Sequence, residues 1–265
     1  MTRSIRRLIG TLAAVALVGA LAAPAAAADN AWVRVVHASP DAPNVDVWVD
    51  GSKVLTDVPF TAVSDYLELA PGEYNIQVVE TGTTSPAVID ANLTFEGGMA
   101  YTIAATGKLA DSTFGPVVLT DDLTTVDGMS KLRVFHASPS APASVDVAVT
   151  DGPILVEGLA YPEATGYLTV DPGTYALEIR AAGDTAAALT LSATLEGGKN
   201  YTAIAMDGGD AGVQVIVAVD AEMIADTAMA PSRGNLVATI GLIMLAAALV
   251  LTVVGSRRFA EFRAR

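Results

Sequence analysis

The sequence has no cysteine in its 265 residues and only two histidines. Without cysteine the chain can form no disulfide framework, no thiolate metal site and no cysteine nucleophile. The histidines, His37 and His136, lie about a hundred positions apart, so no zinc-ligand spacing occurs. We therefore expect cores held by packing alone, with no metal and no other cofactor.

Positive charge is also scarce between the chain ends. Residues 29–230 contain seven Lys and Arg against 28 Asp and Glu, a formal net charge of −21. Such a surface repels phosphate backbones, so we do not expect a nucleic-acid partner. Acids and amides gather at Asp41-Asn44-Asp46, Asp121-Asp122 and Asp207-Asp210. Their oxygens suit calcium, but none has the spacing of a dedicated calcium loop, and solvated loop charge is the alternative.

Both chain ends carry targeting features. Residues 1–28 combine three arginines, an apolar run and final small residues, which predicts a cleaved signal peptide for the secretory or the twin-arginine route. Residues 236–254 form an uncharged apolar segment long enough to span a bilayer as a helix. The basic tail 255–265 predicts a cytoplasmic C-terminus, and residues 222–235 a stalk outside the membrane.

The stretch before this apolar segment is similar to the site at which sortases attach proteins to the cell wall. Residues 230–234 read Ala-Pro-Ser-Arg-Gly, with arginine where the threonine of the acyl link would stand. We therefore expect a retained anchor: a single-pass protein of the cell membrane whose ectodomain lies outside the cell.

An internal repeat organises the segment between the ends. Residues 34–50, R-V-V-H-A-S-P-D-A-P-N-V-D-V-W-V-D, return at 133–149 as R-V-F-H-A-S-P-S-A-P-A-S-V-D-V-A-V. Shared tyrosine-flanked Pro-Gly and Glu-Gly-Gly segments follow in register, with a period of about 100 residues. The pattern predicts two domains, repeat 1 at residues 29–128 and repeat 2 at residues 129–221.

Within each repeat the apolar residues alternate with a period of two, which predicts strands. Val45 and Val47 point inward in this pattern, whereas Asp46 and Trp48 point outward. Counting turns and alternating runs gives about seven strands per copy. We therefore predict an all-β protein with two tandem immunoglobulin-like or transthyretin-like β-sandwich domains and one C-terminal transmembrane helix. The Pro71-Gly72 turn predicts a hairpin.

The first two predicted strands of each repeat suggest an ion pair. Arg34 and Asp46 both point outward on strands that we expect to be neighbours, as do Arg133 and Asp146. We therefore predict an exposed cross-strand pair in each copy, stabilising by about 0.2 to 1 kcal/mol.

The segment R-V-x-H-A-S-P-x-A-P, followed by V-D-V and later by P-G-x-Y, resembles the bacterial and archaeal family of domain of unknown function 4397. The resemblance covers both copies, residues 31–221, and implies secreted or surface-anchored β-domains, often in tandem. It brings no activity and no catalytic residue. Repeat 2 departs from repeat 1 in having Ser140 where repeat 1 has Asp41. The motif residues shared by the copies are Arg34, His37, Ser39, Pro40, Asp46, Arg133, His136, Ser138, Pro139 and Asp146.

The shared motif allows an enzymatic interpretation. Ser39, His37 and Asp46 are the residue types of a nucleophile, a base and an orienting acid, which would make the protein an envelope hydrolase. Against this, Pro40 holds Ser39 extended, and Asp46 points away from the face that carries His37. We expect instead that the imidazole hydrogen-bonds the backbone of the following loop and that the protein has no catalytic activity.

Trp48 is the candidate binding residue, because it points outward where repeat 2 has Ala148. An outward aromatic ring can stack on a sugar or anchor a protein partner. A covering loop is the alternative. The sequence thus predicts a surface protein with a binding, adhesion or display role, and an extracellular glycan or protein as its partner.

Overall fold

The structure is a computed structural model that describes residues 29–208 and 212–223. In these ranges the chain forms sixteen β-strands, and no helix there is long and apolar enough to cross a membrane. The predicted signal peptide, transmembrane segment and cytoplasmic tail lie outside the described residues, as does nearly all of the predicted stalk.

Repeat 1 folds into two four-stranded sheets, which gives eight strands where about seven were predicted. The inner sheet, which faces repeat 2, has the order β4-β1-β7-β8. Its strands are β1 (Ala31–His37), β4 (Leu67–Leu69), β7 (Ala100–Thr106) and β8 (Gly115–Asp121). The outer sheet has the order β3-β2-β5-β6, and its strands are β2 (Val45–Val49), β3 (Ser52–Val58), β5 (Gly72–Glu80) and β6 (Ala87–Phe95).

Repeat 2 has the same topology. Its inner sheet has the order β12-β9-β15-β16, with β9 (Ser130–His136), β12 (Leu168–Val170), β15 (Lys199–Asp207) and β16 (Val213–Glu222). Its outer sheet has the order β11-β10-β13-β14, with β10 (Ser144–Val149), β11 (Ile154–Ala160), β13 (Gly173–Ala181) and β14 (Leu189–Leu195). The tandem all-β prediction is thereby confirmed.

Turn chemistry fits the hairpin between β2 and β3 but not the predicted hairpin at Pro71-Gly72. Asp50 and Gly51 both have positive φ, at 47° and 73°, as a tight hairpin requires. Gly72 has no positive φ, and the strands on either side of it, β4 and β5, belong to different sheets. The Pro-Gly turn therefore carries the chain from one sheet to the other.

Apolar side chains of both sheets fill each sandwich, in agreement with the period-two pattern. In repeat 1 the core includes Val45, Val47, Phe95 and Ile103, all nearly inaccessible to solvent. The register places Ile103 beside Val35, and in repeat 2 it places Ala203 beside Val134 at the equivalent point. The smaller alanine lines an apolar cavity of about 50 Å³ between the sheets of repeat 2. The core of repeat 2 therefore contains unfilled apolar space beside Ala203.

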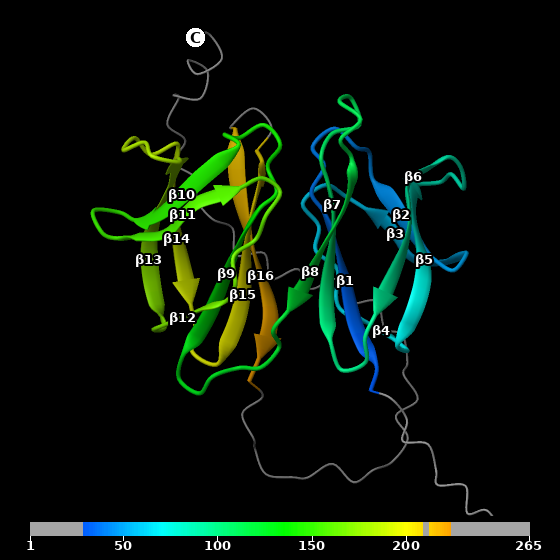
Figure 1. The fold of residues 1–265 in the computed structure, drawn as a ribbon, viewed down its shortest axis with the longest axis horizontal. Coiled ribbons are helices and arrows are strands. Elements are labelled where there is room, and N and C mark those ends of the chain that lie inside the picture. Colours follow the sequence, from blue (N-terminus) through cyan, green and yellow to red (C-terminus); the bar gives the residue numbers. More distant parts are fainter. Residues whose placement is uncertain (1–28, 209–211, 224–265) are drawn as a thin grey trace, which may run out of the picture.

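The two inner sheets pack against each other, so the repeats share a third apolar core (Figure 1). Repeat 1 contributes small residues such as Val36 and Ala104, and repeat 2 contributes the larger Phe135, Ile204 and Met206. All five are fully buried. The large side chains of one repeat thus fill the space opposite the small side chains of the other.

Candidate functional site

The motif arginines lie at the centre of the contact between the repeats. Arg34 donates from Nε to Thr102 Oγ1 of its own repeat at 2.9 Å and from Nη2 to Asp220 of repeat 2. Arg133 donates from Nη2 to Asp121 of repeat 1 at 2.6 Å. The predicted exposed pairs with Asp46 and Asp146 are wrong, because β1 and β2 belong to different sheets, as do β9 and β10. Each arginine is buried and pairs across the repeats.

Further hydrogen bonds complete this four-charge cluster, which comprises Arg34, Asp220, Arg133 and Asp121. Tyr66 donates to Asp121 at 2.6 Å, and Tyr167 donates to Asp220 at 2.7 Å. The two tyrosine rings also lie under the guanidinium groups of Arg34 and Arg133, each 4.8 Å from ring centroid to Cζ. The arginine of each repeat binds the aspartate of the other repeat, so the contact has approximate twofold symmetry.

Burial and charge act in opposite directions on the arginines of this cluster. Burial alone would lower the pKa of Arg34, but the carboxylate of Asp220, supported by that of Asp121, outweighs it and raises the pKa above its ordinary value. Burial raises the pKa of Tyr66 and of Tyr167. Arg34 therefore stays charged and the tyrosines stay neutral donors, which suits a structural cluster rather than a proton-transfer site.

The motif histidines hydrogen-bond the backbone of the following loop, as expected, and the motif serines also have structural partners. The Nε2 atom of His37 lies 3.0 Å from the carbonyl oxygen of Pro43, and that of His136 lies 2.9 Å from the carbonyl oxygen of Pro142. Both imidazoles are buried, which lowers their pKa below 6.5. The hydroxyl of Ser39 donates to Asp41 at 3.2 Å and not to the imidazole. A serine–histidine relay is therefore not formed by these residues.

The difference between the repeats at Asp41 has a structural explanation. Asp41 accepts the hydroxyl of Ser39 and the backbone N–H groups of Leu109 and Ala110, the latter two at 2.9 Å. In repeat 2 the hydroxyl of Ser138 donates instead to Asp207, at the end of β15. The carboxylate that accepts the motif serine thus comes from the β1–β2 loop in repeat 1 and from β15 in repeat 2.

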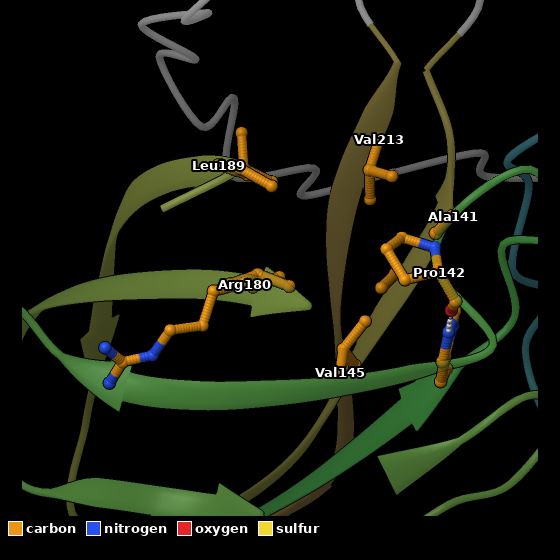
Figure 2. A pocket seen from close by; sticks show the side chains of 10 residues that line it. Ala141, Pro142, Val145, Arg180, Leu189 and Val213 are labelled. Carbon is orange, nitrogen blue, oxygen red and sulfur yellow. Dashed lines mark hydrogen bonds between the residues drawn. The ribbon is translucent and has the colours of Figure 1, made fainter. Parts of the chain in front are cut away.

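A small pocket of about 10 Å³ lies beside His136 (Figure 2). Apolar side chains, among them Val145, Leu189 and Val213, line it, and the guanidinium of Arg180 extends away from it (Figure 2). The Nδ1 atom of His136 has no hydrogen-bond partner among the described residues. The pocket is too small for a substrate, since ligand pockets usually measure hundreds of cubic ångströms.

Trp48 points away from the core of repeat 1, on the outer face of the β3-β2-β5-β6 sheet, and it is partly buried. The ammonium of Lys53 lies 5.2 Å from its ring centroid and also bonds Asp46 at 2.5 Å. Asp46 faces outward as predicted but is fully buried, because Lys53 and the backbone N–H of Asp57 cover it. Part of the indole surface is therefore shielded by Lys53.

A polar network continues across the sheet from Trp48. Gln77 is the cross-strand partner of Trp48, and it donates to Asp90 at 3.1 Å. Asn75 donates both amide hydrogens, to Asp90 at 2.8 Å and to Asn92 at 3.0 Å. The amide oxygens of Asn75 and Gln77 and the amide hydrogens of Asn92 are left without a partner in the described part of the chain. We name this surface (Trp48, Asn75, Gln77, Asp90 and Asn92) the amide platform.

Repeat 2 has no equivalent of the amide platform. The register places Ala148 opposite Ile154 and Glu178, and Glu178 opposite Thr190. The aromatic ring and the amides are therefore features of repeat 1 alone.

Comparison with known proteins identifies the repeats. The family model described as "Domain of unknown function (DUF4397)" matches residues 31–148 and again residues 130–235. The chain belongs to this family. No curated protein matches it. Among solved structures it is similar to "The Bacillus anthracis TIE protein", with 11% identity and a TM-score of 0.22, over 67% of this chain and 34% of that chain. The chain thus spans about a third of that protein's length.

The acidic clusters of these DUF4397 repeats are largely hydrogen-bonded within the fold. Asp121 belongs to the four-charge cluster, Asp41 binds the 109–110 backbone, and Asp207 accepts Ser138. Asp210 lies outside the described residues. In the ranges 29–208 and 212–223, no group of three or more histidine, aspartate and glutamate side chains is placed to hold a metal ion.

The sequence did not predict the roles of three residues. Asp121 ends β8, and Asp220 occupies the matching position near the end of β16. This match between the repeats was the signal that could have identified both as arginine partners. Trp32 on β1 is a second outward tryptophan, 37% exposed, where repeat 2 has Lys131. Trp48 is therefore not the only outward aromatic that repeat 2 lacks.

Proposed function

We propose that this DUF4397 protein is a non-catalytic surface protein that binds an extracellular glycan through the amide platform of repeat 1. The supporting observation is that the platform combines a partly exposed tryptophan with fixed amides, and that repeat 2 has neither. Sugar rings offer apolar faces for stacking and hydroxyl groups for amides, and a neutral glycan avoids repulsion by the −21 segment.

The burial of the motif argues against the envelope hydrolase. Ser39 and His37 are fully buried and bond other groups, and Asp46 lies in the other sheet. The motif therefore serves folding and the joining of the repeats in this proposal. We also propose that the sandwiches are of the immunoglobulin-like or transthyretin-like type.

The proposal includes a location. The signal sequence at 1–28 supports export, and the apolar segment at 236–254 with the basic tail at 255–265 supports a single membrane span with the repeats outside. Fractionation of cells tests this part. We expect the mature protein in the membrane fraction, released by detergent, and recovery in a detergent-insoluble wall fraction would contradict a retained anchor.

Binding is tested with the full chain in detergent, screened against neutral and anionic glycans and against extracellular proteins. We expect neutral glycans to be retained and Trp48→Ala to weaken their binding by about 1 to 3 kcal/mol, the range of an interface anchor. Gln77→Ala should weaken it too. Glu178→Ala is the matched control, because Glu178 holds the position of Gln77 in repeat 2. Equal glycan binding by Trp48→Ala and the control would refute binding at the amide platform. If an extracellular protein binds the parent but not Trp48→Ala, that protein replaces the glycan as the proposed partner.

A further inference from the structure

The end of repeat 2 that adjoins the inter-repeat linker contains a lysine, an asparagine and an aspartate in contact. Lys131 on β9 and Asn200 on β15 are cross-strand partners in a parallel pair. Asp122 and Thr124 belong to the linker between β8 and β9. In repeat 1 the corresponding strand partners are Trp32 and Ala100, so this arrangement exists only once in the described chain.

Asn200 has an unusual hydrogen-bonding state. Its side chain is fully buried, and Nδ2 donates to the carbonyl oxygens of Asp122 at 2.6 Å and Thr124 at 3.1 Å. Its Oδ1 atom is buried without a partner among the described residues. An unsatisfied buried acceptor destabilises a fold, so such an atom calls for an explanation.

The lysine amine lies at the same place. Lys131 Nζ donates to Asp122 Oδ2 at 2.6 Å and to the carbonyl oxygen of Thr124 at 2.6 Å. Lys131 and Asn200 thus bond the same oxygen of Thr124, and this brings the amine beside the side-chain amide. The lysine side chain is 13% exposed. A nucleophile, an amide carbonyl and a proton carrier are therefore assembled at one point.

We propose that Lys131 and Asn200 become joined by an intramolecular isopeptide bond, with Asp122 as the proton carrier. A proton passes from the Lys131 ammonium to Asp122, and the free amine attacks Cγ of Asn200. Asp122 returns the proton to the amide nitrogen as the bond from Cγ to Nδ2 breaks. The new bond joins Nζ to Cγ, and Nζ gives its second proton to the departing ammonia. One ammonium ion therefore leaves, and Asp122 is unchanged. No oxidant, reductant or other reactant is required.

The protonation state of Asp122 before the reaction limits its rate. Burial on its own would raise the pKa of Asp122, but the hydrogen bonds from Lys131 and Thr124, together with the lysine charge, outweigh burial and lower the pKa. Asp122 therefore rests as a carboxylate, and the proton must first cross the 2.6 Å hydrogen bond from Lys131. A slow reaction suffices, because each molecule forms the bond once.

The bond is tested on the full chain, purified in detergent and digested with trypsin. Because an acylated Lys131 is no longer cleaved, we expect peptide 109–133 joined to the peptide that begins at Asn200. Their joint mass should be lower by one ammonia than the sum of the two. Separate peptides ending at Lys131 and beginning at Asn200 in the digest of the mature protein would overturn the proposal, whether or not any variant folds.

Variants assign the roles. Asn200→Ala and Lys131→Arg should yield only separate peptides, and Asp122→Asn should do so while keeping the β circular dichroism spectrum of the parent. Lys199→Arg is the control, since Lys199 pairs with Glu196 and Glu222 and takes no part in the reaction. Joined peptides in folded Asp122→Asn would disprove the role of Asp122, and unjoined peptides in the control would disprove the assignment to Lys131.

Discussion

The four-charge cluster between the repeats allows a sharp test by Asp220→Asn. Asp220 has no exposed side-chain surface, and it accepts from Arg34, from Tyr167 at 2.7 Å and from Thr202 at 2.6 Å. The substitution keeps the shape of the side chain and removes its charge. The carboxylate that still faces Arg34 is then that of Asp121, whose Oδ2 atom lies 3.8 Å from Arg34 Nε.

Removing one partner of a buried ion pair leaves an uncompensated charge, which costs about 3 to 5 kcal/mol. We therefore expect the free energy of unfolding of Asp220→Asn to fall by that amount. Each kcal/mol lowers the Tm of a domain of this size by about 2 to 4 °C, so the Tm should fall by roughly 6 to 20 °C. Urea unfolding and thermal unfolding, both followed by circular dichroism, measure the two quantities.

The control is Glu222→Gln, which removes an exposed partner of Lys199. The Glu222 side chain is 61% exposed and its oxygen lies 3.3 Å from Lys199 Nζ, so we expect a loss below about 1 kcal/mol. Asp121→Asn should resemble Asp220→Asn, because the two carboxylates are equivalent across the repeats. If Asp220→Asn stays within about 1 kcal/mol of the parent, the cluster does not hold the repeats together as argued.

Three further predictions concern the sandwiches. Ala203→Ile should fill the 50 Å³ cavity of repeat 2 and stabilise by about 0.5 to 2 kcal/mol, whereas Ile103→Ala should destabilise by about 2 to 5 kcal/mol in urea unfolding. Burial alone would raise the pKa of Asp46, but the hydrogen bonds from Lys53, Asp57 and Gly82 lower it from 3.8 to about 2. The stability from Asp46 is thus present above pH 3.8 and lost as the pH falls toward about 2, so Asp46→Asn should flatten the pH dependence of Tm in that window. Burial lowers the pKa of His37 below 6.5, so the folded protein loses stability as the pH falls below 6.5. His37→Asn should therefore reduce the dependence of Tm on pH in this range. It should also lower Tm at neutral pH.

The sequence predicted those features that depend on neighbouring positions. Alternation placed Val45 and Val47 in the core and Trp48 outside it, and the repeat placed the two sandwiches. The direction of Arg34, away from its own core, was also right. Each of these properties follows from the period of a strand or from comparison of the copies.

The sequence could not predict which strands share a sheet. We placed β1 beside β2, but β1 pairs with β4 and β7, and the partner of Arg34 lies 186 residues away. We also expected side chains that point away from the core to be exposed to solvent. Instead, the other repeat covers Arg34, and Lys53 covers Asp46. Which distant strands pair, and which sheet face another domain covers, cannot be recognised from neighbouring residues in a single sequence.

The reciprocal contact between the repeats limits how this architecture can grow. In a stacked array, each unit presents one face to the unit before it and another face to the unit after it. Here each repeat uses the same face, the one with Arg34 or Arg133, and that face is occupied once the two have met. A third DUF4397 repeat added to this chain would find no matching face to join. The protein is thus a closed pair, equivalent to a dimer in a single polypeptide, and longer relatives built on this contact should gain repeats two at a time.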